Sequence, residues 1–390
     1  MKQLALSYTC ISDGCRIFSI SDLIKRKKVK VADRKVDVYA VTKDNGFVKS
    51  DSIHDFAVYS SDISNYSIVK KDYIAYNPSR LNIGSLALFK DEIGAVSPMY
   101  VVFECKTDLV IPKFLFYFLK SNSIMYKIDC LKEEGARFKF NFEKWKKINI
   151  ILPPLKQQQH IVHILGYYTF LIDTLKEELS LRQKQFEYYR EKLLAFDDES
   201  ILKPLGHVGS FTRGNGLTKS EFVDKGIGCI HYGQIYTSIG FSMSKTLTYV
   251  SERTADPLVK VRTGNLVIAC TSENVEDVCK AVVWEGLDNI VTGGHACVFR
   301  HSENPRYIGY CLQTNNFYQQ KKKYVYGAKV FDIKTEKLSK ILIPVPGLAT
   351  QQSIVSYLDN FESLISNIQE EIALRTKQYE YYRDSLLSFE

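Results

Sequence analysis

The histidines and cysteines of this chain are the residues best suited to hold a metal ion, so their spacing is informative. His160 and His163 lie three residues apart, and on a helix they would share one face and could meet a metal ion. The trio His295, Cys297 and His301 lacks the spacing of a zinc site, and strand alternation would place His295 and Cys297 on one face for packing. We therefore expect no metal site and interpret His160 and His163 as surface residues.

The motifs of the common catalytic sites do not occur in the sequence. There is no GxGxxG loop opening a helix, no Walker-type GxxxxGK[ST], no HExxH and no GxSxG. The segment Tyr76-Asn77-Pro78-Ser79 resembles the Asn/Asp-Pro-Pro-aromatic segment of amino-methyltransferases, but the second proline and the aromatic residue are absent. No glycine-rich methyl-donor loop precedes it. We expect a turn that presents polar side chains, and no catalytic residues in this chain.

Basic and polar side chains on predicted loops are the remaining candidates for function. Arg, Asn, Gln and Lys are suited to pair with base edges, whereas clustered Lys mainly neutralises phosphate. As a group they predict a DNA-facing surface, although each one alone is explained equally well as a solvated surface residue. The candidates in the first half of the chain are Arg26, Lys28, Asn77, Ser79, Arg80, Asn82, Arg137 and Lys139. Those in the second half are Arg213, Lys219, Tyr232, Gln234, Thr271, Ser272 and Lys329.

A long repeat organises the chain that carries these residues. Residues 158–196 read QQHIVHILGYYTFLIDTLKEELSLRQKQFEYYREKLLAF, and residues 351–389 read QQSIVSYLDNFESLISNIQEEIALRTKQYEYYRDSLLSF, about half identical without a gap. Prolines precede both copies and mark where a strand stops and a helix can start. The repeat divides the chain into a first module (residues 1–152), a long helix (153–200), a second module (201–345) and a second long helix (346–390).

Each copy of the repeat carries an apolar seam at alternating steps of three and four residues. Such a spacing favours a partner helix over a flat core, and at about 1.5 Å per residue roughly forty residues make a rod of about 60 Å. The first seam comprises Tyr168, Ile172, Leu175, Leu179, Arg182, Phe186, Tyr189, Leu193 and Phe196. The second comprises Phe361, Ile365, Ile368, Ile372, Arg375, Tyr379, Tyr382, Leu386 and Phe389.

The nearest partner for each seam is the other copy. Sequence alone leaves parallel and antiparallel pairing open, but two-fold symmetry of the halves would make the pair antiparallel. An arginine interrupts both seams at the same place, and a polar seam residue usually fixes register at some cost in stability. The alternative is that each amphipathic helix packs only on its own module.

Net charge separates the modules from the helices. Residues 1–150 carry 25 basic and 17 acidic side chains, and residues 201–343 carry 18 and 12, so both modules are basic. Residues 151–200 carry 6 and 8, and residues 344–390 carry 3 and 7, so both helical segments are acidic. This is the footprint of two modules that each meet a polyanion, joined by helices that stay clear of it or meet protein.

The composition favours a two-core protein of a reducing compartment. The 390 residues, of which 45% are apolar, suffice for two or three domains. There is no run of eighteen apolar residues and no apolar region of a signal peptide, and the nine cysteines form no CxxC pair. We expect a cytoplasmic protein with free, mostly buried thiols.

Both modules read as mixed α/β segments. Short β-type runs alternate with turn residues at 36–41, 73–76, 85–89 and 99–105 in the first module, before a helical stretch at 113–130. The second module has such runs at 228–231, 266–270, 281–284 and 297–300, before a helical stretch at 304–324. The predicted fold is therefore mixed α/β, with two modules related by pseudo-two-fold symmetry and joined by two long helices that form an antiparallel coiled coil. Because the modules differ in sequence where the helices do not, they suggest two readers of different things on one scaffold.

This layout resembles the specificity subunit of type I restriction-modification enzymes over the whole chain. The most specific segments are LPPLKQQQHIVHIL with its echo PVPGLATQQSIVSYL, KQFEYYREKLL with KQYEYYRDSLL, YNPSRLNIGSLAL followed by VSPMYVVFEC, and GHVGSFTRGNGLTKSEF with GCIHYGQIY. The resemblance implies that each module is a target-recognition domain that reads one half of a split DNA site. It also implies that the coiled coil sets the unread gap and that this subunit is not catalytic.

The partners follow from the same resemblance. It implies double-stranded DNA, two adenine-N6 methyltransferase subunits and, in the full complex, two ATP-dependent restriction subunits, with no membrane. S-adenosylmethionine and ATP are expected on those subunits only, and docking is expected to rely on the two long helices and the module flanks. Two other classes of function stay open from the residues alone. A monomeric methyltransferase would bind S-adenosylmethionine itself, and a structural adaptor would show no salt-dependent affinity for DNA.

Overall fold

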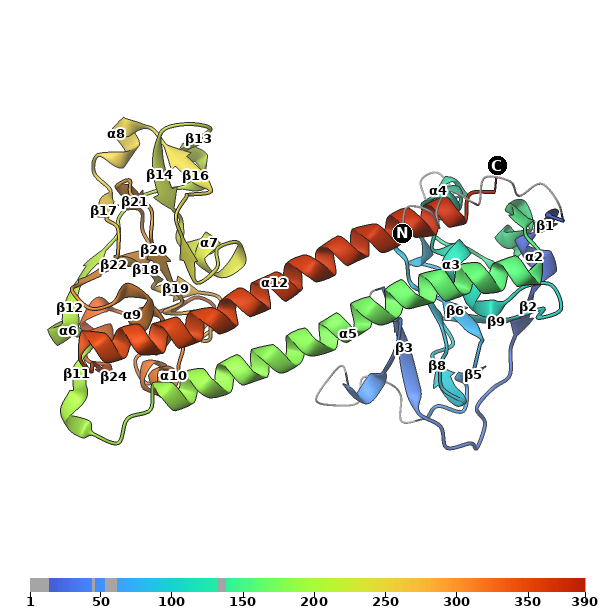
Figure 1. Ribbon diagram of the computed structural model, residues 1–390, viewed down its shortest axis with the longest axis horizontal. Coiled ribbons are helices and arrows are strands. Elements are labelled where there is room, and N and C mark those ends of the chain that lie inside the picture. The colour runs from blue at the N-terminus through green and yellow to red at the C-terminus, as the bar shows by residue number, and fades with distance from the viewer. Residues whose placement is uncertain (1–13, 44–45, 53–61, 132–137, 390) are drawn as a thin grey trace. The chain divides into compact units, whose positions relative to one another are not determined.

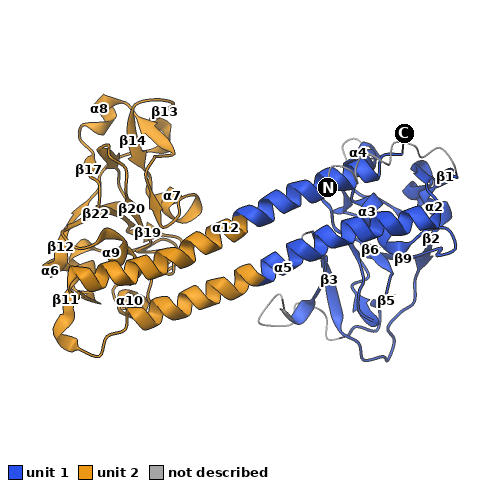
Figure 2. Ribbon diagram, in the orientation of Figure 1, with its two compact units in different colours: residues 1–177, 370–390 blue, residues 178–369 orange. Residues whose placement is uncertain are grey.

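The computed structural model describes residues 14–43, 46–52, 62–131 and 138–389. The chain divides into two compact units, residues 1–177 with 370–390 and residues 178–369 (Figure 2). Each unit contains one whole predicted module and one part of each long helix. The units therefore cut across the helices, whereas the boundaries predicted from the sequence separate helices from modules.

The first unit contains two four-stranded sheets (Figure 1). One has the order β2-β9-β6-β7, and the other has the order β4-β3-β8-β5, in which β3 and β8 run parallel. The elements are β1 (Arg16–Ser19), α2 (Ile20–Leu23), β2 (Ile24–Lys27), β3 (Val38–Thr42), β4 (Gly46–Lys49), β5 (Ser67–Lys70), β6 (Ile74–Tyr76), β7 (Leu86–Leu88), β8 (Ile93–Val96), β9 (Val101–Cys105), α3 (Pro112–Leu119), α4 (Asn122–Cys130) and β10 (Asn149–Leu152), which pairs with β1.

The second unit repeats this arrangement with five strands in each of the two sheets. Its sheets have the orders β12-β22-β18-β20-β15 and β13-β16-β14-β21-β17, with β14 and β21 parallel. The elements are β11 (Leu202–Pro204), α6 (Leu205–Val208), β12 (Gly209–Arg213), β13 (Phe222–Val223), β14 (Ile227–Ile230), α7 (Tyr232–Thr237), β15 (Ser242–Met243), β16 (Thr248–Val250), α8 (Glu252–Ala255), β17 (Val259–Val261), β18 (Leu266–Ala269), β19 (Thr271–Ser272), β20 (Ala281–Trp284), β21 (Ile290–Thr292), β22 (Ala296–His301), α9 (Pro305–Cys311), α10 (Asn315–Lys322), β23 (Phe331–Asp332), α11 (Thr335–Leu338) and β24 (Leu342–Pro344).

The predicted α/β character is confirmed, but each predicted helical stretch consists of two helices. In both modules a hydroxyl residue ends one helix and begins the next. The Ser121 hydroxyl donates to the Phe118 carbonyl at 2.7 Å, and the Thr314 hydroxyl donates to the Cys311 carbonyl at 2.9 Å. Residues 121 and 314 have extended backbones and precede α4 and α10 as N-caps, which explains why the helix cannot continue through them.

The long helices are α5 (Leu155–Leu193) and α12 (Leu348–Leu386), and they pair in opposite directions. In the first unit the Tyr168 ring stacks on Tyr382, with centroids 5.3 Å apart. In the second unit Tyr189 stacks on Phe361 at 5.5 Å. The start of α5 therefore meets the end of α12, and the end of α5 meets the start of α12. A shift of 193 residues converts one stack into the other, so the pairing is antiparallel and two-fold symmetric, as predicted.

Every predicted seam position in both copies is buried or half-buried, although Phe196 and Phe389 lie beyond the helix ends at Leu193 and Leu386. Each of the two seam arginines forms an ion pair with a glutamate of its own helix. Arg182 contacts Glu178 at 3.4 Å, and Arg375 contacts Glu371 at 2.7 Å, each four residues earlier. Both guanidinium groups lie on the half-exposed edge of the seam, so they interrupt the apolar contact without leaving a buried charge.

The long helices also pack on the modules, in addition to pairing with each other. In the first unit Tyr379 packs edge-on against Tyr117 of α3, with centroids 6.3 Å apart. In the second unit Phe186 packs in the same way against Tyr310 of α9 at 6.2 Å. Each module therefore contacts both long helices, one that follows it in the chain and one from the other half.

A buried glutamine fixes the start of each long helix. Gln158 is 1% exposed; its Nε2 donates to the carbonyls of Leu109 (3.0 Å) and Pro153 (2.8 Å), and its Oε1 accepts from the N–H of Ile111 (2.9 Å). Gln351 repeats this arrangement in the second unit with the N–H of Asn304 and the carbonyl of Pro346. The Gln-Gln pair that follows each proline segment is thus the join between module and helix.

A carboxylate from the far end of each helix holds α4 or α10. Asp384 accepts from the backbone N–H of Asn122 at 3.1 Å and from its side-chain amide at 2.7 Å. Glu191 accepts from the backbone N–H of Asn315 at 3.0 Å. Residues 191 and 384 are 193 positions apart, as are 122 and 315, so this contact is symmetric too. A negative charge near a helix N-terminus is favourable.

Two further expectations concern burial. The cysteines are mostly buried as predicted, namely Cys105, Cys229, Cys270, Cys279, Cys297 and Cys311. Within the part of the chain that the structure describes, no helix is both long and apolar enough to cross a membrane.

Candidate nucleic-acid interface

The strand register shows that many of the predicted DNA-binding residues occupy matching positions in the two modules. Strands β2 and β12 each follow directly on a one-turn helix, which makes Lys28 the counterpart of Arg213. The N–H of Phe140 donates to the Pro78 carbonyl (2.8 Å), and the N–H of Ile333 donates to the Cys270 carbonyl (3.1 Å). Counting from these bonds gives three more pairs of counterparts: Ser79 with Thr271, Arg80 with Ser272, and Lys139 with Asp332.

These counterparts lie at one end of the β2-β9-β6-β7 sheet and of the matching second sheet. We call this place the shared sheet end. Residues far apart in the sequence meet there because neighbouring strands of each sheet start and stop side by side. The side chains differ in chemistry at two of the four matching positions, Arg80 against Ser272 and Lys139 against Asp332, whereas the other two pairs keep a cation and a hydroxyl. The sequence predicted candidates on loops of both modules, but it did not show that candidates of the first module occupy the same positions in the fold as candidates of the second.

In the second module the shared sheet end is held together by an ion pair. Arg213 donates to both carboxylate oxygens of Asp332, at 3.0 and 2.5 Å, and to the Ile333 carbonyl at 3.0 Å. The bidentate bond to Asp332 raises the pKa of Arg213 further above its ordinary value. Asp332 also accepts from the Thr271 hydroxyl at 3.3 Å. Arg213 is thus already engaged within the protein, and its contact with DNA stays a prediction.

Other predicted residues of this module also support the local structure. Thr271 and Ser272 are buried. Gln234 accepts from the N–H of His231 at 3.0 Å and closes a capping box at the start of α7. Lys219 and Lys329 are exposed, and Tyr232 is half-exposed. The exposed side chains are those free to meet a ligand.

His295 corrects an expectation from the sequence. It was expected to pack on the same face as Cys297, but Cys297 is fully buried while His295 is exposed. The reason is that β22 begins at Ala296, and His295 has a left-handed backbone with φ of 67° at the end of a Gly-Gly turn. Strand alternation does not extend into a turn. The pair Gly293-Gly294 before a β-type run was the signal that could have placed this histidine outside the strand.

In the first module the predicted residues divide similarly into supporting and exposed groups. Asn77 is buried, and its Oδ1 accepts from the N–H of Ser79 at 2.9 Å. The Arg26 guanidinium lies over the Phe142 ring, 5.9 Å from its centre. Asn82 is half-buried. Arg26 is nevertheless exposed, as are Ser79 and the cations Lys28, Arg80 and Lys139. Arg137 lies outside the described residues.

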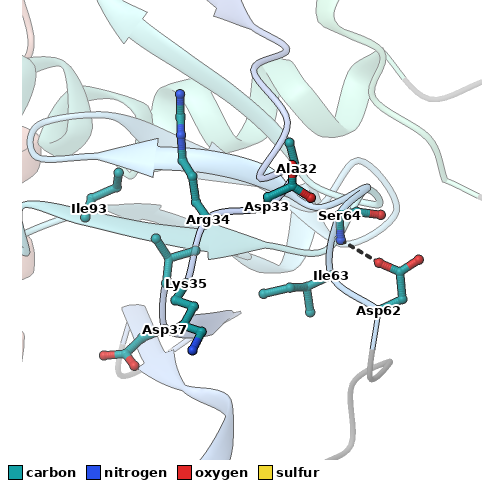
Figure 3. Close-up of a pocket in the computed structure, with 10 residues that line it drawn as sticks. Ala32, Asp33, Arg34, Lys35, Asp37, Asp62, Ile63, Ser64 and Ile93 are labelled. Carbon is teal, nitrogen blue, oxygen red and sulfur yellow. Dashed lines mark hydrogen bonds between the residues drawn. The ribbon is translucent and has the colours of Figure 1, made fainter.

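Two concave surfaces in the first unit were not predicted. One has a volume of 690 Å³ and opens beside β3; it is lined by Ala32, Asp33, Arg34, Lys35, Val36, Asp37, Asp62, Ile63, Ser64 and Ile93 (Figure 3). Its two cations are balanced by three carboxylates, and Asp37 is already paired with Lys49 at 2.6 Å. The charge balance does not favour an anion there.

The other concave surface has a volume of 660 Å³ and lies at the start of α5, where His160 and His163 contribute to its lining. His163 is exposed and His160 half-exposed, in agreement with their interpretation as surface residues. No group of three or more His, Cys, Asp or Glu side chains arranged to hold a metal ion exists among the residues that the structure describes.

Comparison with known proteins places the chain in a family. The profile of the family described as Type I restriction modification DNA specificity domain matches residues 13–181 and 278–374. A type I restriction enzyme specificity subunit of Escherichia coli is 28% identical over 312 residues, which cover 75% of this chain and 74% of that protein. A putative type I restriction enzyme specificity subunit of Haemophilus influenzae is 29% identical over 270 residues, covering 65% and 67% of the two chains.

Solved structures agree on the fold. The S subunit of a type I restriction-modification system from M. genitalium covers 98% of both chains with a TM-score of 0.56 at 13% identity. A chain from a study of assembly and conformational transition in a type I restriction-modification system covers 97% of this chain and 99% of its own length, with a TM-score of 0.61 at 14% identity. With its two modules on paired antiparallel helices, the chain belongs to the family of type I restriction-modification DNA specificity subunits.

Proposed function

We propose that this chain selects a bipartite DNA site, with each module reading one half. The observation that carries the proposal is the shared sheet end, where two modules whose common strands have the same order present different chemistry at matching positions, such as Arg80 against Ser272 and Lys139 against Asp332. One frame with different side chains suits two readers of different sequences, because base-edge contacts depend on side-chain chemistry while the frame only positions them. The excess of basic residues in both modules supports contact with the phosphate backbone.

The antiparallel helices supply the spacing between the half-sites. Each has 39 residues, which corresponds to about 58 Å of rigid helix. Each module is fastened to both helices by the buried glutamine, the helix-capping carboxylate and the aromatic contacts. Loss of helical turns would therefore change the gap and leave both half-sites unaltered.

Methyl transfer and cleavage are proposed to be the work of partner subunits. Leu181 and Tyr188 on α5 are both 59% exposed, and their repeats on α12, Leu374 and Tyr381, are 53% and 70% exposed. Exposed apolar residues at heptad spacing on two symmetric helices suit two copies of one protein partner, which we propose to be the methyltransferase subunit. S-adenosylmethionine would bind there, ATP would bind to restriction subunits where these join, and this chain would act without a catalytic centre in the cytoplasm.

The test is a genome-wide map of adenine methylation with the gene intact and deleted. Loss of one split motif on deletion would support the proposal and define both half-sites. Replacement of residues 1–152 by a module from another specificity subunit should then change one half of the motif only. An unchanged map in a strain with an active methyltransferase partner would contradict the proposal and favour a structural adaptor. Binding of S-adenosylmethionine by the purified chain alone would favour a monomeric methyltransferase.

A further inference from the structure

One pair of matching positions at the shared sheet end combines exposed side chains with different chemistry. In the first module Tyr76 pairs with Val101, and in the second Ile268 pairs with Cys297. Strands β6 and β18 hold the same place in their sheets, so Val101 and Cys297 are counterparts. Two residues earlier, in the turn that enters the strand, the counterparts are Met99 and His295.

The His295 ring is held in place although it is exposed. Its Nδ1 lies 2.9 Å from the Thr271 hydroxyl, and the Tyr232 ring packs against it with centroids 4.9 Å apart. Its carbonyl accepts from the N–H of Cys270 at 2.8 Å, so the backbone is fixed as well. No hydrogen bond to Nε2 is made within the part of the chain that the structure describes. A ring with one nitrogen anchored and the other open to solvent is oriented before any ligand arrives.

The backbone conformation of His295 is less favourable for histidine than for glycine. A non-glycine residue with φ of 67° is less stable there than glycine would be, and such conformations persist where the surroundings fix them. Glycine occupies the two preceding positions, so the chain uses glycine in this turn but not at residue 295. The side chain at 295 is therefore retained in spite of a backbone that disfavours it.

Met99 occupies the same place in the first module with an apolar side chain. It is 58% exposed, and the Asn77 amide donates to its sulfur at 4.0 Å. Asn77 is buried and follows β6 directly, and Thr271, in β19, belongs to the matching segment that follows β18. Both exposed side chains are thus contacted by a polar residue of the segment after the neighbouring strand.

We propose that Met99 and His295 are equivalent base-contacting residues and that their difference gives the two modules different base preferences at one position of each half-site. This inference rests on the proposed function and specifies which residues carry it. Because the Thr271 hydroxyl donates to Asp332, it accepts from Nδ1–H of the neutral His295 ring, and the open Nε2 is an acceptor. Nε2 can therefore accept from a donor such as N6 of adenine or N4 of cytosine in the major groove. The methionine sulfur is only a weak acceptor, and its apolar side chain suits the methyl group of thymine.

The test uses the full-length chain expressed with its methyltransferase partner in a bacterial host that lacks adenine methylation. The methylated motif is read by long-read sequencing for the unaltered chain and for His295→Met, Met99→His and His207→Ala. His207 is the control because it is an exposed histidine on α6, just before β12 and at the opposite end of the same sheet. Thermal melting of each purified complex shows whether the variant is folded.

His295→Met should relax or change one base position in one half-site, with a loss of discrimination of about tenfold, and leave the other half-site and the gap as they were. Met99→His should alter one position of the other half-site, and His207→Ala should alter nothing. Methylation by His295→Met of the original motif with unchanged selectivity in both halves overturns the inference. If the unaltered chain itself directs no split motif, the proposed function fails instead.

If a variant is folded but directs no methylation, its base preference is measured by competition binding. The purified complex is offered duplexes that differ at one base pair of the half-site at a time. Preference lost at a single position for His295→Met, and kept for His295→Gln because its amide oxygen still accepts, supports the inference. Unchanged preference at every position, or an equal loss at all positions, overturns it.

Discussion

Replacement of Gln158 by leucine should destabilise the first unit by an amount that follows from its hydrogen bonds. The substitution keeps the volume similar but removes the partner of the Ile111 N–H and of two carbonyls, all in a nearly closed environment. An unpaired buried group costs about 1–3 kcal/mol, and the gain from burying leucine offsets part of the total. We expect a net loss of about 3 kcal/mol, which lowers the melting temperature of a unit this size by about 6–12 °C.

The assay is differential scanning calorimetry of the full chain, with two comparison variants. Gln351→Leu removes the symmetric contacts and should lower the transition of the second unit by a similar amount. Gln159→Leu is the matched control, because Gln159 is the exposed neighbour on the same helix. If Gln158→Leu melts within about 2 °C of Gln159→Leu, the glutamine does not join module to helix in the way its contacts indicate.

Three further predictions concern the end of α5 and the second module. Tyr189→Ala should lower the free energy of unfolding by about 2–4 kcal/mol because it removes the ring stack in the coiled coil. Tyr188→Ala, at an exposed position, should hardly change the free energy of unfolding but should weaken co-purification with the methyltransferase partner. Equal destabilisation by both variants would count against the seam. Glu191→Gln should cost about 0.5–1 kcal/mol, an effect that high salt should diminish, because it removes a charge at the start of α10. Burial, together with the charges of Lys219 and His295, lowers the pKa of His231 below its ordinary 6.5, so the unfolded chain takes up a proton at a higher pH than the folded chain. The melting temperature should therefore fall as pH drops below about 6.5, and His231→Asn, which keeps the helix cap, should make that fall smaller. A fall of the same size in the variant would be evidence that another residue causes it.

Much of the fold was predictable because it depends on local pattern. The apolar seams predicted two long helices, and the prolines before each copy predicted where they start, but the predicted first segment ran to residue 200 whereas α5 ends at Leu193. The break between α3 and α4 was missed because Ser121 acts through a backbone geometry that residue type alone does not reveal. His295 was misplaced because the two-residue strand period was extended to a residue that precedes the start of β22 at Ala296.

The candidate interface was only partly predictable. Residue types and loop positions pointed to the same end of the sheet in both modules. They could not show that Arg213 is engaged by Asp332, because the two residues are separated by 119 positions and meet only when β12, β19 and β23 come together. They likewise gave no reason to pair Met99 with His295, since the equivalence follows from strand register rather than from similarity of sequence.

The sequence by itself determined the two-fold plan, since a repeat with a 3.5-residue seam requires two similar helices with an apolar face to bury. It also determined the basic character of the modules and the glutamines at the helix starts. Only the tertiary structure decided the antiparallel direction, the contact of each module with both helices, and which polar side chains stay free for a ligand. The physical reason is range: a helical period is set by neighbours a few residues apart, whereas the freedom of a charged side chain depends on partners that only the folded chain brings close.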